Sequence, residues 1–212
     1  HSDEDGLNDG AEFRGSGPEQ YKSNPLEEDT DGDGLDDDVE VFRGSDNYVT
    51  DPKLSDTDGD GLTDGLEIKG SGPENYASNP TKKDSDDDGI LDAEEVSKGE
   101  DGYVTDPGSD DTDRDGLKDK DEIDGNNKYG FRSNPTAQDT DGDGLTDGLE
   151  IKGSGPGNYA SNPLKKDSDD DGIPDAEEVS KGEDGYVTDP RSDDTDKDGL
   201  KDKDEIDGKD RK

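Results

Sequence analysis

The sequence has no cysteine, methionine or tryptophan, and it has a single histidine. Without cysteine, no disulfide can hold the fold together and thiol redox chemistry is excluded. Apolar residues are only 19% of the 212 residues, and none of their runs is long enough for a signal peptide or a membrane span. We therefore expect a mature fragment of a larger protein. Its apolar surface is too small for burial to offset the entropy of ordering the backbone.

Charge is abundant and of one sign. Charged residues are 42% of the chain and the formal net charge is -41. Such a charge argues against nucleic acid or an anionic membrane as a partner, and we expect no membrane insertion. Composition alone predicts disorder, so an ordered chain would need another source of stability, and bound divalent cations are the natural candidate.

One twelve-residue segment recurs eight times, at intervals of 27 or 28 residues. Its second copy, Asp29 to Glu40, reads DTDGDGLDDDVE. The copies occupy residues 1–12, 29–40, 56–67, 84–95, 111–122, 139–150, 167–178 and 194–205. Residues 56–125 recur almost verbatim at 139–208, which gives a higher-order period of 83 residues. This register predicts a single tandem array over residues 1–212, in which each unit contacts its neighbours.

Each complete copy places carboxylates at positions 1, 3, 5, 9 and 12, Gly at position 6 and Leu or Ile at position 7. This is the pattern of a calcium loop, in which short acids converge on one ion, Gly permits a sharp turn, residue 7 gives its carbonyl and Glu at 12 closes the shell. Oxygen ligands in this number favour calcium over magnesium and zinc. The sequence therefore predicts about 8 calcium ions.

The candidate metal ligands are the acids of each copy and its residue at position 7. They are Asp3, Asp5, Leu7, Asp9, Glu12, Asp29, Asp31, Asp33, Leu35, Asp37, Glu40, Asp56, Asp58, Asp60, Leu62, Asp64, Glu67, Asp84, Asp86, Asp88, Ile90, Asp92, Glu95, Asp111, Asp113, Asp115, Leu117, Asp119, Glu122, Asp139, Asp141, Asp143, Leu145, Asp147, Glu150, Asp167, Asp169, Asp171, Ile173, Asp175, Glu178, Asp194, Asp196, Asp198, Leu200, Asp202 and Glu205. The first copy has His1 where an Asp is expected. We interpret His1 as a boundary or tag residue and predict the weakest or most variable site there.

Positions 9 and 12 also have a structural interpretation. Asp followed three residues later by Glu resembles a capping box that opens a short helix. We expect Glu at 12 to be a ligand and leave open whether Asp at 9 binds through water or only caps. The following helix is predicted to run about two turns, as in Asp64 to Lys69 before Gly70. A proline four residues before each later loop leaves no room for an entering helix. These prolines are Pro25, Pro52, Pro80, Pro107, Pro135, Pro163 and Pro190.

The spacers place an aromatic residue four positions before each of these prolines. These are Tyr21, Tyr48, Tyr76, Tyr103, Phe131, Tyr159 and Tyr186. Such a stripe can indicate ligand binding, but we favour packing on the Leu or Ile at position 7 and on the apolar residue after Glu. Phe131 supports packing, because it lacks the hydroxyl that recognition by hydrogen bonds would need.

Five carboxylates around one divalent ion leave excess negative charge in each unit. A second ion would relieve the repulsion by sharing the acids at positions 3, 5 and 12 and by taking oxygens from the Ser/Thr-Asx-Pro segment of the spacer. We therefore consider two alternatives, one ion per loop or two, the latter giving up to about 16 ions in all.

Residues Asp56 to Glu67, joined through Ser78-Asn79-Pro80 to Asp84 to Glu95, resemble thrombospondin type 3 repeats of the bacterial kind. The resemblance covers nearly the whole chain. It implies calcium-dependent structure, a secreted or cell-surface setting and a place in a larger modular protein, with the acids at positions 1, 3, 5 and 12 as ligands. The chain departs from the thrombospondin version in lacking cysteine, and its Gly-rich spacers are longer than those common in bacterial repeats.

These features predict a calcium-stabilised tandem repeat, mostly irregular, with one short helix after each loop, an elongated body and a minimal hydrophobic core. The favoured function is a non-enzymatic extracellular stalk that calcium makes rigid. The alternative is an acidic array for adhesion to a host ligand or a mineral surface, or for metal sequestration. Enzymatic activity is not expected, since His1 is terminal and the acids belong to the metal loops.

Overall fold

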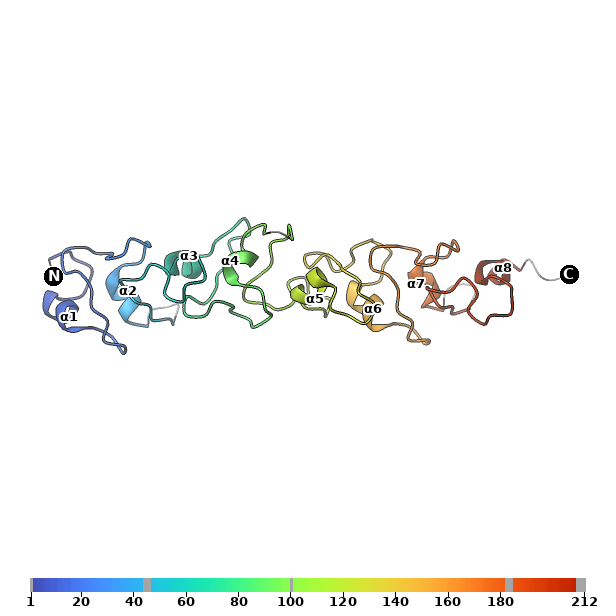
Figure 1. The fold of residues 1–212 in the computed structure, drawn as a ribbon, viewed down its shortest axis with the longest axis horizontal. Coiled ribbons are helices and arrows are strands. Elements are labelled where there is room, and N and C mark those ends of the chain that lie inside the picture. The colour runs from blue at the N-terminus through green and yellow to red at the C-terminus, as the bar shows by residue number, and fades with distance from the viewer. Residues whose placement is uncertain (1, 44–46, 100, 182–184, 209–212) are drawn as a thin grey trace. The chain divides into compact units, whose positions relative to one another are not determined.

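The computed structural model describes residues 2–43, 47–99, 101–181 and 185–208 (Figure 1). Within these ranges the chain is mostly irregular, and one short α-helix follows each loop. The helices are α1 (Asp9–Arg14), α2 (Asp37–Val41), α3 (Asp64–Lys69), α4 (Asp92–Glu95), α5 (Asp119–Asp124), α6 (Asp147–Lys152), α7 (Asp175–Glu178) and α8 (Asp202–Ile206). Over the same ranges the pairing of extended segments is confined to isolated antiparallel bridges, Ser16–Tyr21, Ser71–Tyr76 and Ser154–Tyr159. None of these helices has the length and apolar character needed to cross a bilayer.

The chain divides into two compact units, His1–Asp110 and Asp111–Lys212. The first unit contains α1 to α4 and the second α5 to α8, so each holds four loops with their helices. Within each unit the helices succeed one another in chain order, with irregular segments running around them (Figure 1). The predicted repeat fold is thus confirmed, whereas the grouping of all eight copies into a single array stays a prediction.

Each helix begins at loop position 9, one residue after an N-cap in extended conformation. The N-cap is therefore the residue at position 8, as in Thr63 with ψ 148°, and not the Asp at position 9 as the capping-box interpretation had it, because Asp64 is already the first helical residue. Helix α3 ends at Lys69, and Gly70 follows with φ 91°, a conformation that favours glycine. In the described ranges the helices lie after the loops and not before them, as the prolines predict.

The apolar core is small and follows the loops. Most residues at position 7 and several after the final Glu are buried, among them Leu7, Leu35, Val41, Ile90, Val96, Leu117, Leu145, Ile151, Ile173 and Val179. Most acids at positions 9 and 12 are buried at least as deeply, with 0% exposure for Asp64, Glu67 and Glu150, whereas Asp9 is exposed and Glu205 is half-buried. Since carboxylates are rarely buried unless they are paired, the interior of each repeat is organised around charge.

Most aromatic residues of the spacers are partly exposed to solvent, and Tyr186 is 53% exposed. Tyr48 lines a cavity of about 390 Å³ together with Ile68, the apolar residue after Glu67, and with Gly108. The Arg191 guanidinium lies 4.3 Å from the centre of the Tyr129 ring, an attractive cation–π geometry. Tyr129 thus contacts a later spacer, whereas the packing of the seven predicted rings on the residue at position 7 stays a prediction.

Candidate metal centre

Each loop curls around its own carboxylates. In the second copy, Asp29 accepts hydrogen bonds from the backbone N–H of Gly32 at 2.7 Å and of Gly34 at 2.9 Å. The Asp33 N–H donates to Asp31 Oδ1 at 3.2 Å, and the Leu35 N–H donates to Asp33 Oδ1 at 2.8 Å. One oxygen from each of Asp29, Asp31 and Asp33 lies within 4.8 Å of the other two. The backbone thus holds positions 1, 3 and 5 around a common centre, and their role as metal ligands stays a prediction.

The Glu at position 12 enters this arrangement from the helix. The spacer hydroxyl of Ser78 donates to Glu67 Oε1 at 2.9 Å, and the Ser78 N–H donates to the Glu67 carbonyl at 3.0 Å. The same hydroxyl contact recurs in the pairs Ser23–Glu12, Thr50–Glu40, Thr105–Glu95, Ser133–Glu122, Ser161–Glu150 and Thr188–Glu178. The Ser/Thr of the spacer therefore fixes the glutamate. The next residue has another role, since the Asn79 side chain accepts hydrogen bonds from the N–H and hydroxyl of Thr81 in the turn at the proline.

Two carboxylate oxygens recur along the described chain as buried atoms without a hydrogen-bond donor. One is Oδ2 of the Asp at position 3, in Asp31, Asp58, Asp86, Asp113, Asp141 and Asp169. The other is Oε2 of the Glu at position 12, in Glu12, Glu40, Glu67, Glu95, Glu122, Glu150 and Glu178. Burying a carboxylate oxygen with no compensating partner is costly, and a bound cation would supply the partner that both atoms lack.

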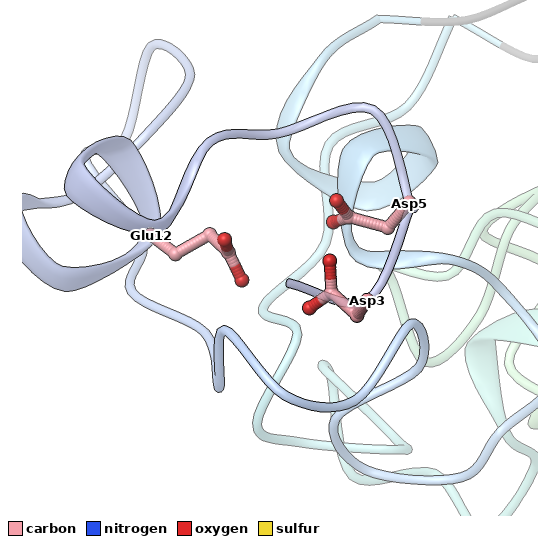
Figure 2. A group of neighbouring side chains, drawn as sticks. All are labelled: Asp3, Asp5 and Glu12. Atoms are coloured by element: carbon pink, nitrogen blue, oxygen red, sulfur yellow. The ribbon is translucent and has the colours of Figure 1, made fainter. Parts of the chain in front are cut away.

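The first copy gathers its acids in the same way. Asp3 and Asp5 lie opposite Glu12, with their carboxylates turned toward the space between them (Figure 2). One oxygen of each lies within 4.8 Å of the other two, and Glu12 is 0% exposed. His1 lies outside the described residues, so the predicted weakness of this site stays a prediction.

Burial and mutual repulsion raise the pKa of these acids. Burial, followed by the charge of Asp31, raises the pKa of Glu40 to about 9. Burial and the neighbouring Asp171 raise the pKa of Asp169 to about 7. A buried acid with such a pKa is more stable with a bound proton or metal ion than in the ionised form without a partner.

The Asp at position 9 is held by the residue at position 2 of its own loop. Asp64 Oδ1 accepts from the Thr57 N–H at 2.8 Å, and Asp64 Oδ2 accepts from the Thr57 hydroxyl at 2.6 Å. Ser2 makes the same two contacts with Asp9. The side chain thus does not cap its helix. Position 2 is Ser or Thr in all eight copies, a signal that could have revealed this contact.

Held in this way, the Asp at position 9 meets acids of the preceding repeat. One oxygen from each of Asp33, Glu40 and Asp64 lies within 4.8 Å of the others, and Asp60, Glu67 and Asp92 form the equivalent group. The Gly65 N–H donates to Asp33 Oδ2 at 2.8 Å, and the Ala93 N–H donates to Asp60 Oδ2 at 3.0 Å. Sequence reasoning placed this Asp in its own loop and missed the contact.

The last copy differs from the others. Glu205 is only half-buried, and Asp196 and Asp198 are exposed. In the earlier copies the glutamate at position 12 is buried, with an exposure of 2% for Glu40 and 0% for Glu67.

The donor set fits calcium. All of the gathered side chains offer carboxylate oxygens, and calcium takes 6 to 8 oxygens at about 2.3–2.6 Å, so two ligand oxygens of one ion lie no more than about 5 Å apart. The groups described above meet this limit. A bound cation would supply positive charge to the buried oxygens and would cross-link loop, helix and spacer.

Comparison with known families agrees with this chemistry. The family described as the bacterial TSP3 repeat, where TSP3 stands for thrombospondin type 3, matches residues 29–46, 56–72, 84–99, 139–155 and 167–182. Each match begins at the first Asp of a loop. The matches are to a repeat family, and none is to an enzyme family. No curated protein matches the chain.

Proposed function

For a chain that carries bacterial TSP3 repeats at five positions, we propose a calcium-binding array whose folded structure depends on the bound ions. The observation that carries this proposal is the set of buried glutamate oxygens without a hydrogen-bond donor, exemplified by Glu67 Oε2. An interior built on such groups opposes folding until a cation neutralises it.

In each repeat the acids at positions 1, 3 and 5, the carbonyl at position 7 and the Glu at position 12 would hold the ion. The loop hydrogen bonds orient the aspartates, as between Leu35 and Asp33. The spacer hydroxyl orients the glutamate through one oxygen and leaves the other for the metal, as between Ser78 and Glu67. Partners of this kind fix ligand orientation and tune affinity.

The setting that suits this chemistry is extracellular, where calcium is abundant enough to fill modules of this kind. There the array would serve as a stalk or spacer within a larger secreted or cell-surface protein, without catalytic activity. Burial of the glutamates supports this structural role over adhesion, because a deeply buried acid such as Glu150 is not available to a mineral or a host ligand.

Calcium titration of the chelator-treated chain tests the proposal. Far-ultraviolet circular dichroism should show a large and reversible gain of structure on addition of calcium, and native mass spectrometry should count about 8 or more ions. Magnesium at the same concentration should act weakly, since it requires a small octahedral site. A chain that is equally structured and protease-resistant in EDTA would refute calcium-dependent folding.

Small-angle scattering separately tests the stalk. In saturating calcium the particle should be extended and rigid, with a maximum dimension that shrinks in proportion when one 83-residue block is deleted. A flexible coil under saturating calcium would contradict the stalk while leaving calcium binding intact.

A further inference from the structure

We propose that the cavity beside Tyr48 is a docking site for an arginine side chain of a basic partner protein. The site goes beyond the calcium-binding stalk and uses none of the proposed metal ligands. The cavity has a volume of about 390 Å³ and lies within the first compact unit. That volume is in the range of about 300–1,000 Å³ typical of ligand pockets. The cavity is lined by Tyr48, Ile68, Ala77, Ser78, Asn79, Ser85 and Gly108.

The second unit carries an arginine where the first has the glycine of this cavity. Gly108 and Arg191 are 83 residues apart, one period of the higher-order repeat, and each follows a proline. The Arg191 guanidinium lies 4.3 Å from the centre of the Tyr129 ring, and that ring stacks on Phe131 with the centres 5.7 Å apart. Phe131 is the counterpart of Tyr48, whereas the counterpart of Tyr129 lies outside the described residues. The second unit thus places its own guanidinium against an aromatic wall.

Burial of the apolar wall differs between the units in the same sense. In the second unit Ile151 and Ala160 are each only 8% exposed. Their counterparts in the cavity, Ile68 and Ala77, are the same residue types, yet Ile68 is half-buried and Ala77 is exposed. Covering such apolar surface is favourable, so a group that fills the cavity of the first unit gains the burial that the second unit already has.

The backbone does not require the glycine that leaves the cavity open. Gly108 is not among the glycines with a positive φ, so its conformation is accessible to other residues. The nearest atom to an added Cβ is Asp106 Oδ1 at 3.5 Å, which is an ordinary van der Waals contact. A side chain is therefore sterically permitted at this position, and the chain leaves the place open although its turn could carry an arginine.

The polar part of the wall suits a ligand that is rich in donors. The Ser78 hydroxyl donates to Glu67 at 2.9 Å, and the Ser85 hydroxyl donates to Asp92 at 2.6 Å. Each hydroxyl has then used its single proton, so it can meet a ligand only with its lone pairs. A guanidinium has five N–H donors and no acceptor, and its plane stacks on aromatic rings. The net charge of -41 would in addition attract a basic partner.

Solution NMR of the full chain in saturating calcium tests the site, with N-acetyl-arginine amide as the probe. Salt at about 150 mM screens the general attraction between the probe and the acidic chain. The ring signals of Tyr48 and the methyl signals of Ile68 and Ala77 should shift and reach saturation, while the methyl signals of Ile151 and Ala160 should not. The neutral analogue N-acetyl-citrulline amide should bind about 5-fold more weakly or less, because it lacks the charge that the ring attracts.

Three variants connect these shifts to the cavity. Gly108→Arg should abolish the shifts at Tyr48, because the new side chain fills the cavity from within the chain. Leu26→Arg is the matched control: Leu26 also follows a proline, is 75% exposed and does not line the cavity, so the shifts should persist with the same added charge. Arg191→Gly should create the corresponding opening in the second unit, so the probe should then shift the ring signals of Tyr129.

Absent shifts in the wild-type chain, unchanged shifts in Gly108→Arg or equal binding of the citrulline derivative would overturn the proposal. Sedimentation velocity examines another occupant: a wild-type dimer that Gly108→Arg abolishes would mean that a second copy of the chain fills the cavity, and the separate basic partner would be wrong. Circular dichroism checks the fold of each variant. Should Gly108→Arg not fold, Arg191→Gly decides, since shifts at Tyr129 support the site and their absence overturns it.

Discussion

At the scale of single residues, a short list of contacts defines each repeat. The Asp at 1 binds backbone N–H groups of its own loop, the Glu at 12 is fixed by a spacer hydroxyl, and the Asp at 9 is fixed by the hydroxyl at position 2. These contacts recur along the chain because each sequence position recurs, so a single substitution can be compared with the same site elsewhere.

The spacer hydroxyl gives the first such prediction. Ser161 is 0% exposed and donates to Glu150 Oε1 at 2.9 Å. Ser161→Ala should destabilise the calcium-loaded chain by about 1–3 kcal/mol, because it removes a hydrogen bond to a buried charged group. Urea unfolding in saturating calcium measures this. The control is Ser97→Ala, since Ser97 is exposed and donates only to helix carbonyls, where a change within about 0.5 kcal/mol is expected. Equal losses would argue against the role of the spacer hydroxyl.

The sequence predicted that the acids of each loop lie together, because their spacing is local, and their binding of calcium stays a prediction. Positions 1, 3 and 5 lie so close in the chain that the backbone must bring them together, as it does for Asp29, Asp31 and Asp33. The partner of Asp64 in the preceding repeat was not predictable from the motif, because periodicity does not specify which repeat a side chain faces. The invariant Ser or Thr at position 2 shows only that the Asp is engaged.

At the scale of elements, proline and glycine set the boundaries. The prolines exclude an entering helix, and Gly70 ends α3 where the sequence predicted. The turns of the spacers were less predictable, since their glycines are fixed by contacts with other repeats. At Gly155, with φ 65°, an added Cβ would lie 1.8 Å from the carbonyl oxygen of Val179, which belongs to the next repeat.

This close approach yields a prediction about packing between repeats. Gly155→Ala should destabilise the calcium-loaded chain by about 2–4 kcal/mol, from backbone strain at positive φ together with the clash at Val179. Gly130 is the matched control, because its φ is 71° and no atom lies within 4 Å of its added Cβ. Gly130→Ala should cost about 1–2 kcal/mol, from strain alone. Thermal unfolding in calcium measures both, and indistinguishable losses would contradict a backbone contact at Gly155.

At the scale of the whole molecule, protons would compete with the proposed calcium ions for the same buried oxygens. Burial, opposed by the Thr105 hydrogen bond and reinforced by Asp86 and Asp88, raises the pKa of Glu95 to about 9, and burial raises that of Glu67 to about 8. An unfolded glutamate has a pKa near 4.5. Without calcium, the folded chain thus binds more protons than the unfolded chain between these values, so its stability falls as pH rises through this range.

The two forms should therefore respond to pH in opposite directions. Acidification from pH 8 to about 4.5 should increase the helical signal and stability of the calcium-free chain, as protons replace the missing cation. The same change should weaken the calcium-loaded chain, because its ligands must be deprotonated to bind metal. Thermal unfolding followed by circular dichroism across this range, with and without calcium, measures both slopes. Parallel slopes would show that these acids do not control folding.

The short reach of the hydrogen bonds between repeats has a kinetic consequence. Within each unit, the side-chain hydrogen bonds that join one repeat to the next connect residues 24 to 36 positions apart, as between Lys83 and Gly59 or Lys152 and Gly116. Closing such short spans costs little chain entropy, and low contact order favours rapid folding. A chain that emerges from an export channel into a calcium-containing medium can thus order each segment once the following one has appeared, without waiting for its distant end.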